Sequence, residues 1–299
     1  MGIQAKIMRF IEVIAALGTI GVGFAHAQSE PSTAQGEQPN RIAIEYVRPQ
    51  NADLQDLYEA LKSYGALEKI QKILSPMRLR EQLVVKTMEC GKINSWYQRE
   101  DSVPTVTLCY ELFKHVLESL PKETAGEGIT AEDAKIGQVL WWTLHEVGHA
   151  TFAMFNVPIL GNEEDAADNF ATYVMLRFTE AVRLIKGAAW AWNEYLRDYQ
   201  RNPVVRVRLE QFADEHGLPQ QRFYNLVCLA LGSDPARFAD LVLADYLPQT
   251  RTQRCVHEYR TLAMSFEKEI APHIDHEMAK SITDANWLPR PVVRSGSEK

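Results

Sequence analysis

The chain has 299 residues, of which 46% are hydrophobic, and a formal net charge of -7. This hydrophobic content is enough for one large domain or for two lobes with a core. The 32 basic and 39 acidic residues give a mildly acidic balance, which argues against nucleic acid or an anionic membrane as the main partner.

The first 27 residues have the pattern of a secretory signal peptide. Lys6 and Arg9 precede an apolar run over 13–24, and Ala25-His26-Ala27 is typical of a cleavage site. The apolar run is shorter than the ~20 residues that span a bilayer, so a cleaved signal is favoured over a membrane anchor. We therefore expect a periplasmic or secreted protein that has no stable membrane span after signal cleavage.

The composition of the remaining chain predicts one domain between two polar ends. Residues 28–41 carry almost no apolar side chains and predict a disordered leader, and 289–299 predict a flexible tail. Between them, we expect a single domain over 42–288. It would consist of a sheet lobe at about 42–128 and a helical lobe at about 129–288, which is an α+β fold with a zincin-like helical half.

The sheet lobe alternates between short strands and helices. Strands are predicted over 42–47, 83–88, 95–97 and 105–110, and helices over 53–64, 67–74 and 111–120. Because the last two strands form a predicted hairpin, we expect a small, mostly antiparallel sheet. The strand 105–110 would lie at an edge, where free backbone groups can bind an extended peptide. A covered structural strand is an equally good interpretation of this segment.

The helical lobe begins with a long helix that carries an HExxH motif. Thr130 and Asp133 form an N-cap signature, and the motif follows at His145, Glu146 and His149. The two histidines lie one turn apart on one face, so their imidazoles can bind a single zinc ion. Glu146 projects close enough to act on a water as general base. The alternative is a buried helix whose histidines are satisfied by backbone carbonyls.

The next helix supplies the carboxylates that such a site needs. Asn162 is a good N-cap for this helix, and Glu164 and Asp168 lie four residues apart on one of its faces. Glu164 would complete a His2Glu zinc site, and Asp168 would accept a ring N–H and fix the tautomer of a ligand histidine. Glu163 is the second choice as ligand, although acidic residues at a helix start also stabilise the helix dipole.

Most of the chain beyond this point is predicted to be helical, with helices over 170–184, 190–199, 205–212, 219–231, 236–246, 254–270 and 276–281. A metallopeptidase also uses a donor that stabilises the tetrahedral oxyanion. Tyr224 is our first choice, with His216, His257 and Arg222 as alternatives. A tyrosine in this context is also often a core residue whose hydroxyl is satisfied.

Four cysteines in an exported chain favour two disulfides, for which three pairings are possible. Cys90 and Cys109 fall on neighbouring strands of the predicted hairpin, and Cys228 and Cys255 fall on helices that flank a short helical hairpin. These are the two pairs that we expect. No CxxC spacing occurs, which argues against a zinc site built from cysteines.

Several segments together resemble a bacterial exported family of metallopeptidase-like proteins of unknown function. The resemblance covers about 42–288 and rests on Cys90-Gly91, Cys109-Tyr110-Glu111-Leu112, 145–150, 161–168, 222–225 and 232–235. The spacing Glu164-x-x-Ala167-Asp168 is similar to that of gluzincins, in which the Glu is the third metal ligand and the Asp supports a ligand histidine. The resemblance therefore implies a zinc peptidase, and it implies no particular substrate.

The sequence predicts hydrolysis of a peptide or polypeptide substrate with one Zn²⁺ per chain. The zinc would lower the pKa of a water towards ~7, and Glu146 would take the water's proton and deliver it to the leaving amine. Two other classes stay open: a non-catalytic zinc-binding envelope protein, and a zinc amidase that acts on cell-wall or small amide substrates. Nothing in the sequence indicates the cleavage preference or the oligomeric state.

Overall fold

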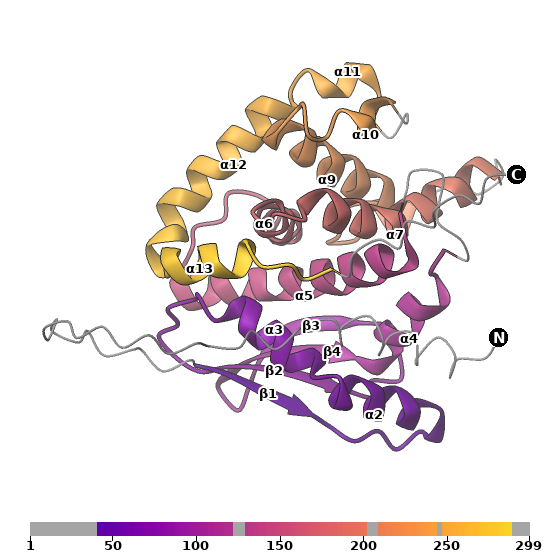
Figure 1. Cartoon of the computed structure of the whole chain (residues 1–299), viewed down its shortest axis with the longest axis vertical. Coiled ribbons are helices and arrows are strands. Elements are labelled where there is room, and N and C mark those ends of the chain that lie inside the picture. Colours follow the sequence, from indigo (N-terminus) through magenta and orange to yellow (C-terminus); the bar gives the residue numbers. More distant parts are fainter. Residues whose placement is uncertain (1–40, 122–128, 202–208, 244–246, 289–299) are drawn as a thin grey trace, which may run out of the picture.

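The computed structural model describes residues 41–121, 129–201, 209–243 and 247–288 (Figure 1). The expected signal peptide, nearly all of the expected leader and the expected tail lie outside these residues. Within them the fold is α+β, as predicted, with a four-stranded sheet in the N-terminal half followed by helices. Among the described helices, none has the length and apolar character that would let it cross a membrane.

The sheet has the strand order β1-β2-β4-β3. Its strands are β1 (Ile42–Tyr46), β2 (Leu83–Met88), β3 (Ser95–Glu100) and β4 (Val103–Cys109). The β1–β2 and β2–β4 pairs are parallel, and the β3–β4 pair is the antiparallel one. The prediction of a mostly antiparallel sheet was therefore wrong, although the predicted hairpin is present as β3 and β4.

The connection between β1 and β2 explains the parallel pairing. The chain passes from β1 through η1 (Ala52–Leu54), α2 (Gln55–Ser63) and α3 (Ala66–Leu74) before it enters β2. Such a helical crossover returns the next strand in the same direction. Because β4 lies between β2 and β3, the edge strands of the described sheet are β1 and β3. Of the two interpretations of 105–110, the covered structural strand is confirmed and the edge strand was wrong.

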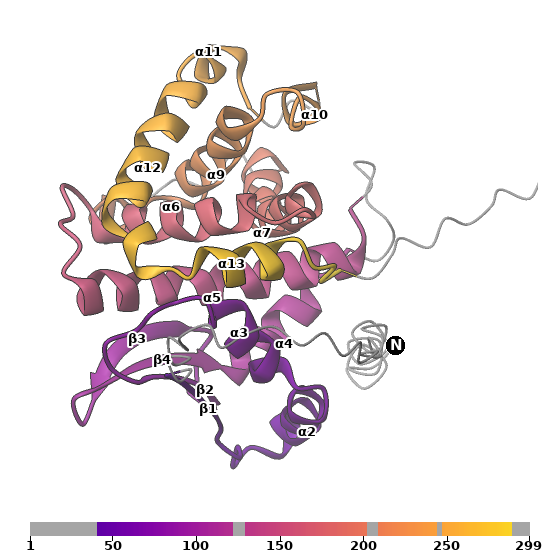
Figure 2. The same cartoon turned by 60° about the vertical axis from the view of Figure 1, so that its left-hand side comes forward.

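The helix α5 (Ala131–Phe155) runs between the sheet and the other helices of the C-terminal half (Figures 1 and 2). It begins as predicted, because Thr130 and Asp133 form a capping box in which each side chain accepts the other's backbone N–H. It ends at Asn156, whose φ of 52° is left-handed. The helix is buried along most of its length, so the residues it carries are held firmly in place.

The remaining described helices precede or follow α5 in the chain. They are α4 (Tyr110–Glu118), α6 (Glu163–Leu176), α7 (Ala181–Arg201), α8 (Leu209–Phe212), α9 (Pro219–Ser233), α10 (Asp240–Leu243), α11 (Gln249–Thr252), α12 (Cys255–Glu269), η2 (Ala271–His273) and α13 (His276–Thr283). The predicted helix over 170–184 was wrong at its end, because α6 stops at Leu176 and a new helix, α7, starts at Ala181.

Two glycines let α5 and α7 cross with their backbones in contact. A Cβ on Gly187 would lie 1.9 Å from the carbonyl oxygen of Asp133, and a Cβ on Gly137 would lie 2.5 Å from that of Leu184. No side chain fits at either position without a shift of one helix. This close crossing holds α5 against the helices that complete the site.

Both expected disulfides are present in the structure. Cys90 follows β2 and is bonded to Cys109 at the end of the neighbouring strand β4, with the Cα atoms 5.6 Å apart. Cys228 on α9 is bonded to Cys255 on α12, with the Cα atoms 5.0 Å apart. The first bond lies within the sheet lobe and the second within the helical lobe.

Candidate metal centre

The site lies where α5 and α6 pack against each other, and small residues make this close packing possible. A Cβ on Gly148 would lie 3.3 Å from the Cα of Ala167, so a larger residue at 148 would crowd α6. Asn162 caps α6 by accepting the backbone N–H of Glu164 at 2.8 Å. The first turn of α6 therefore faces the HExxH turn of α5.

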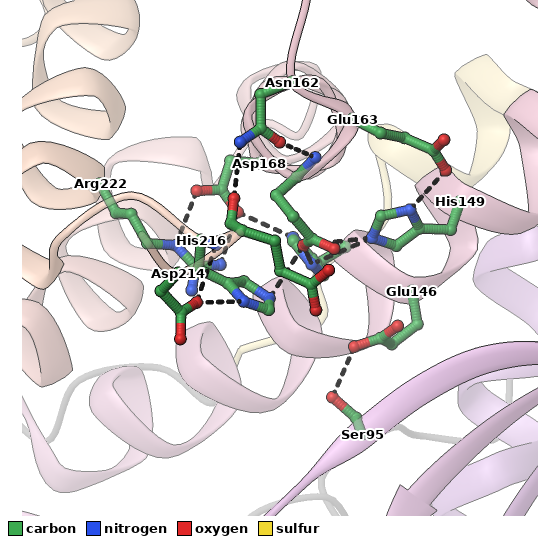
Figure 3. Close-up of polar contacts among 12 residues, drawn as sticks. Ser95, Glu146, His149, Asn162, Glu163, Asp168, Asp214, His216 and Arg222 are labelled. Atoms are coloured by element: carbon green, nitrogen blue, oxygen red, sulfur yellow. Dashed lines mark hydrogen bonds and ion pairs between the residues drawn. The ribbon is translucent and has the colours of Figure 1, made fainter. Parts of the chain in front are cut away.

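His145 is buried and contacts two carboxylates of α6. Its Nδ1 is 2.7 Å from Oδ1 of Asp168, and its Nε2 is 3.0 Å from Oε2 of Glu164. His149, one turn further along α5, directs its Nε2 to the same oxygen of Glu164 at 3.4 Å. Its Nδ1 is 2.8 Å from Oε1 of Glu163. Glu163, the second choice as ligand, thus contacts the far side of His149 instead of the point where the Nε2 atoms meet (Figure 3).

The spacing of these donor atoms fits a zinc ion. The two Nε2 atoms of His145 and His149 are 3.3 Å apart, and each lies 3.0–3.4 Å from the Glu164 oxygen. Tetrahedral zinc with bonds of about 2.0–2.1 Å holds its ligand atoms about 3.4 Å from one another. Imidazole nitrogen and carboxylate oxygen are also ligand types that zinc accepts. These three side chains therefore fit the zinc ion that a peptidase with an HExxH motif requires.

The charges of these groups stabilise one another. Burial disfavours the charged form of His149, but its hydrogen bonds to the carboxylates of Glu164 and Glu163 outweigh burial and raise its pKa to about 9. Burial likewise opposes the charged form of His145, yet Asp168 and Glu164 raise its pKa. In return the imidazoles hold the pKa of Glu164 well below its usual range, although burial acts in the opposite direction. Glu164 is therefore ionised, and its negative charge lies beside the imidazoles of His145 and His149.

Glu146 lies on the side of α5 that faces the sheet. It is 6% exposed, and its Oε1 accepts a hydrogen bond from the hydroxyl of Ser95 at 2.8 Å. Ser95 is the first residue of β3, so the edge strand and the HExxH helix meet at this carboxylate (Figure 3). This role of Ser95 was not predicted from the sequence, because no local pattern links it to a residue 51 positions further along the chain.

A family model described as "Putative metallopeptidase" matches residues 46–268. The chain belongs to this family. No curated protein and no solved structure matched the chain. Membership supports a metal-dependent hydrolytic role on peptides, and it leaves the metal and the individual residue roles to be argued from the site.

A third histidine, His216, contacts the cluster from the segment between α8 and α9. The Nε2 of His216 is 2.9 Å from Oε2 of Glu164, and its Nδ1 is 3.3 Å from Oδ1 of Asp214. His216 was named as an alternative donor in the sequence analysis, but its contact with Glu164 was not foreseen. The local Asp214-x-His216 spacing is the signal that could have indicated it, because a carboxylate beside a histidine often orients the ring.

Tyr224, the first choice as oxyanion donor, lies apart from the cluster. It lines a separate surface pocket with Gln221, Asn225 and Arg251, and its ring contacts Phe223. The face of α9 that meets the cluster carries Arg222 instead, whose guanidinium donates to Asp168. Residues two apart on a helix point about 200° apart, so when Arg222 faces α6 Tyr224 must face away. His257, a further alternative, is exposed on α12.

Proposed function

We propose that the protein hydrolyses peptide bonds with a zinc ion held by His145, His149 and Glu164, and with Glu146 as the general base. The observation that carries the proposal is the convergence of these three donors on one point beside a buried second glutamate. When bound, zinc supplies a Lewis acid that polarises a carbonyl and lowers the pKa of water.

The carboxylates around the histidines prepare them to bind a cation. Asp168 and Glu163 each lie at the Nδ1 of one imidazole, at 2.7 and 2.8 Å. A carboxylate in this position holds the ring proton on Nδ1, so that Nε2 presents its lone pair to the metal. The rings are thereby oriented by the folded chain itself.

Glu146 has the contacts of a positioned base. The Ser95 hydroxyl donates to its Oε1, which fixes the rotamer of the carboxylate. In the proposed reaction a carboxylate oxygen of Glu146 takes a proton from water and then delivers it to the nitrogen of the leaving amine. Ser95 acts on this step only through Glu146 and is therefore a positioning residue.

The free edge of β3 supports a peptide as substrate. The backbone N–H of Cys109 donates to the carbonyl of Asn94, which makes these two a hydrogen-bonded pair of the antiparallel ladder. Because such pairs alternate, Ser95, Tyr97 and Arg99 direct their backbone N–H and C=O groups away from β4. An extended peptide could add to this row beside Glu146. A small amide would use none of these groups, so the peptidase is favoured over the amidase.

The two disulfides support an exported protein, because such bonds persist in oxidising compartments such as the periplasm. We therefore place the proposed peptidase in the bacterial envelope or outside the cell, where its substrate would be a polypeptide or peptide.

The test of the proposed function is Glu146→Gln, assayed for zinc content and for cleavage of casein. We expect one zinc per chain in both forms and a loss of activity of about 100- to 10,000-fold in the variant, which is the usual contribution of a general base. Glu277→Gln, at an exposed position of α13, is the control and should behave like the wild type.

Other outcomes would point to the other classes. Full activity of Glu146→Gln would reject Glu146 as the base. A wild-type protein that binds zinc tightly but cleaves neither casein nor a broad peptide library would indicate a non-catalytic zinc protein. Cleavage of peptidoglycan fragments without cleavage of peptides would indicate an amidase.

A further inference from the structure

Three imidazoles, and not two, converge on the same oxygen of Glu164. The Nε2 atoms of His145, His149 and His216 lie 3.0, 3.4 and 2.9 Å from Oε2. His145, His216 and Glu164 also offer ligand atoms that all lie within 4.8 Å of one another. His216 is thus as close to this oxygen of Glu164 as the two histidines of the motif are.

Each of the three imidazoles has its own carboxylate at Nδ1. The pairs are His145 with Asp168 at 2.7 Å, His149 with Glu163 at 2.8 Å, and His216 with Asp214 at 3.3 Å. This arrangement keeps the proton on Nδ1 and leaves the Nε2 lone pair for a metal. An oxyanion donor would instead need a proton on Nε2.

The segment that carries His216 is anchored where it passes the site. Asp214 also accepts the backbone N–H of His216 at 2.9 Å, and the side-chain amide of Asn162 donates to the carbonyl of Glu215 at 2.6 Å (Figure 3). Because Asn162 is the N-cap of α6, this contact ties the segment to the helix that presents Glu164. The place of His216 is thus built by the fold.

We propose that His216 is a third histidine ligand of the bound metal in the resting protein, that Asp214 is its supporting carboxylate, and that His216 is the ligand exchanged when substrate enters. This inference rests on the proposed function. Three imidazoles and Glu164 would fill a tetrahedral shell, whereas hydrolysis needs a position for water. His216 would therefore hold the site closed until it is displaced.

Exposure singles out His216 as the exchangeable ligand. Its side chain is 38% exposed, whereas those of His145, His149 and Glu164 are 2%, 12% and 17% exposed. It also lies outside the regular helices, while the other three donors are carried by α5 and α6. Its withdrawal would cost fewer packing contacts than the withdrawal of any other donor.

X-ray absorption at the zinc edge of the zinc-loaded protein counts the imidazole ligands. We expect three in the wild type and two in His216→Ala. In a chelator competition, His216→Ala should bind zinc more than about 100-fold less tightly, because the loss of a mere supporting contact already costs about 10- to 100-fold. Asp214→Ala should fall within that smaller range, and His257→Ala, the control on α12, should match the wild type.

Exchange is tested by adding acetohydroxamate, which binds zinc through two oxygens. The imidazole count of the wild type should fall from three to two, and a count that stays at three would overturn the exchange. Two imidazoles in the resting wild type would overturn the ligand role of His216 while leaving the proposed function intact. A wild type that binds no stoichiometric zinc would reject both proposals.

Discussion

Asp168 connects three helices through its carboxylate. It accepts from Nδ1 of His145 on α5 and from two nitrogens of Arg222 on α9, at 2.8 and 2.7 Å. The guanidinium of Arg222 also lies 4.6 Å from the ring centre of Trp192. Burial raises the pKa of Asp168, but its hydrogen bonds to His145 and Arg222 outweigh this and lower it. A charged carboxylate is thus kept beside His145, which we propose as a metal ligand.

Removal of the Arg222 side chain should therefore lower the stability of the fold. Arg222→Ala leaves the buried carboxylate of Asp168 without its counter-charge, and we expect the free energy of unfolding in urea to fall by about 3–5 kcal/mol. Arg222→Lys retains the charge but loses the two-pronged contact, so its loss should be smaller. A change below ~1 kcal/mol for Arg222→Ala would show that Asp168 does not depend on this partner.

Some residues of the site could be placed from the sequence, and others could not. Glu164 and Asp168 could be placed on one face of a helix, because four-residue spacing is a property of the helix alone. The sequence could not decide whether Tyr224 or Arg222 faces the cluster, because one helix carries both and only its packing orients them. His216 and Asp214 lie outside the long helices, where periodicity gives no direction.

At the level of elements, β3 is the strand whose position matters most for the proposed function. It offers a free edge beside Glu146, and this depends on the insertion of β4 between β2 and β3. Strand-forming segments can be recognised from β-branched and aromatic residues, but their order in a sheet cannot. The β1–β2 pair is parallel because the chain crosses over through α2 and α3 between these strands. The β2–β4 pair is parallel because the chain passes through β3, which runs antiparallel to β4, between them.

The substrate-binding role of this edge can be tested at Arg99. Arg99→Pro removes one backbone N–H from the free edge without breaking the ladder to β4, because Arg99 faces Pro104 in a pair without hydrogen bonds. The loss of one hydrogen bond of about 1 kcal/mol should raise KM for an extended peptide about fivefold. Arg99→Ala is the control, since it removes the same ion pair with Glu81 and keeps the N–H. Equal KM values for the two variants would argue against binding at this edge.

The boundary between α6 and α7 was decided by contacts from the far end of the chain. The backbone N–H of Thr179 donates to the carbonyl of Thr283, and Glu180 accepts the backbone N–H groups of Trp287 and Leu288. These bonds stop the helix that periodicity alone would continue to residue 184. The break separates the helix that presents Glu164 from the long helix that crosses α5.

At the level of the whole molecule, each disulfide holds one lobe together. The bond between Cys228 and Cys255 joins α9, which carries Arg222, to α12 and closes a separation of 27 residues. The bond between Cys90 and Cys109 joins the ends of β2 and β4 and closes a separation of 19 residues. Loops of this length predict a similar contribution from each bond.

Removal of either bond should lower stability by a similar amount. We expect the double variants Cys228→Ala/Cys255→Ala and Cys90→Ala/Cys109→Ala each to lose about 3 kcal/mol of unfolding free energy in urea, because the unfolded chain gains freedom. Reduction of the wild type should produce a larger loss than either double variant. If reduction left the unfolding midpoint unchanged, the bonds would not be formed in the protein.

The sequence alone placed the HExxH motif on a capped helix and the start of the next helix at Asn162, because caps and periodicity act over a few residues. It also indicated the two cysteine pairs, because the strands and helices that carry them were predicted as neighbours. The folded chain was needed to bring Ser95 to Glu146 across 51 residues and Arg222 to Asp168 across 54, and to carry His216 to Glu164. Those contacts depend on the order of the strands and on helix crossings, such as the crossing of α5 and α7 at Gly137 and Gly187. Packing between distant segments sets both, and no short pattern of residues encodes it.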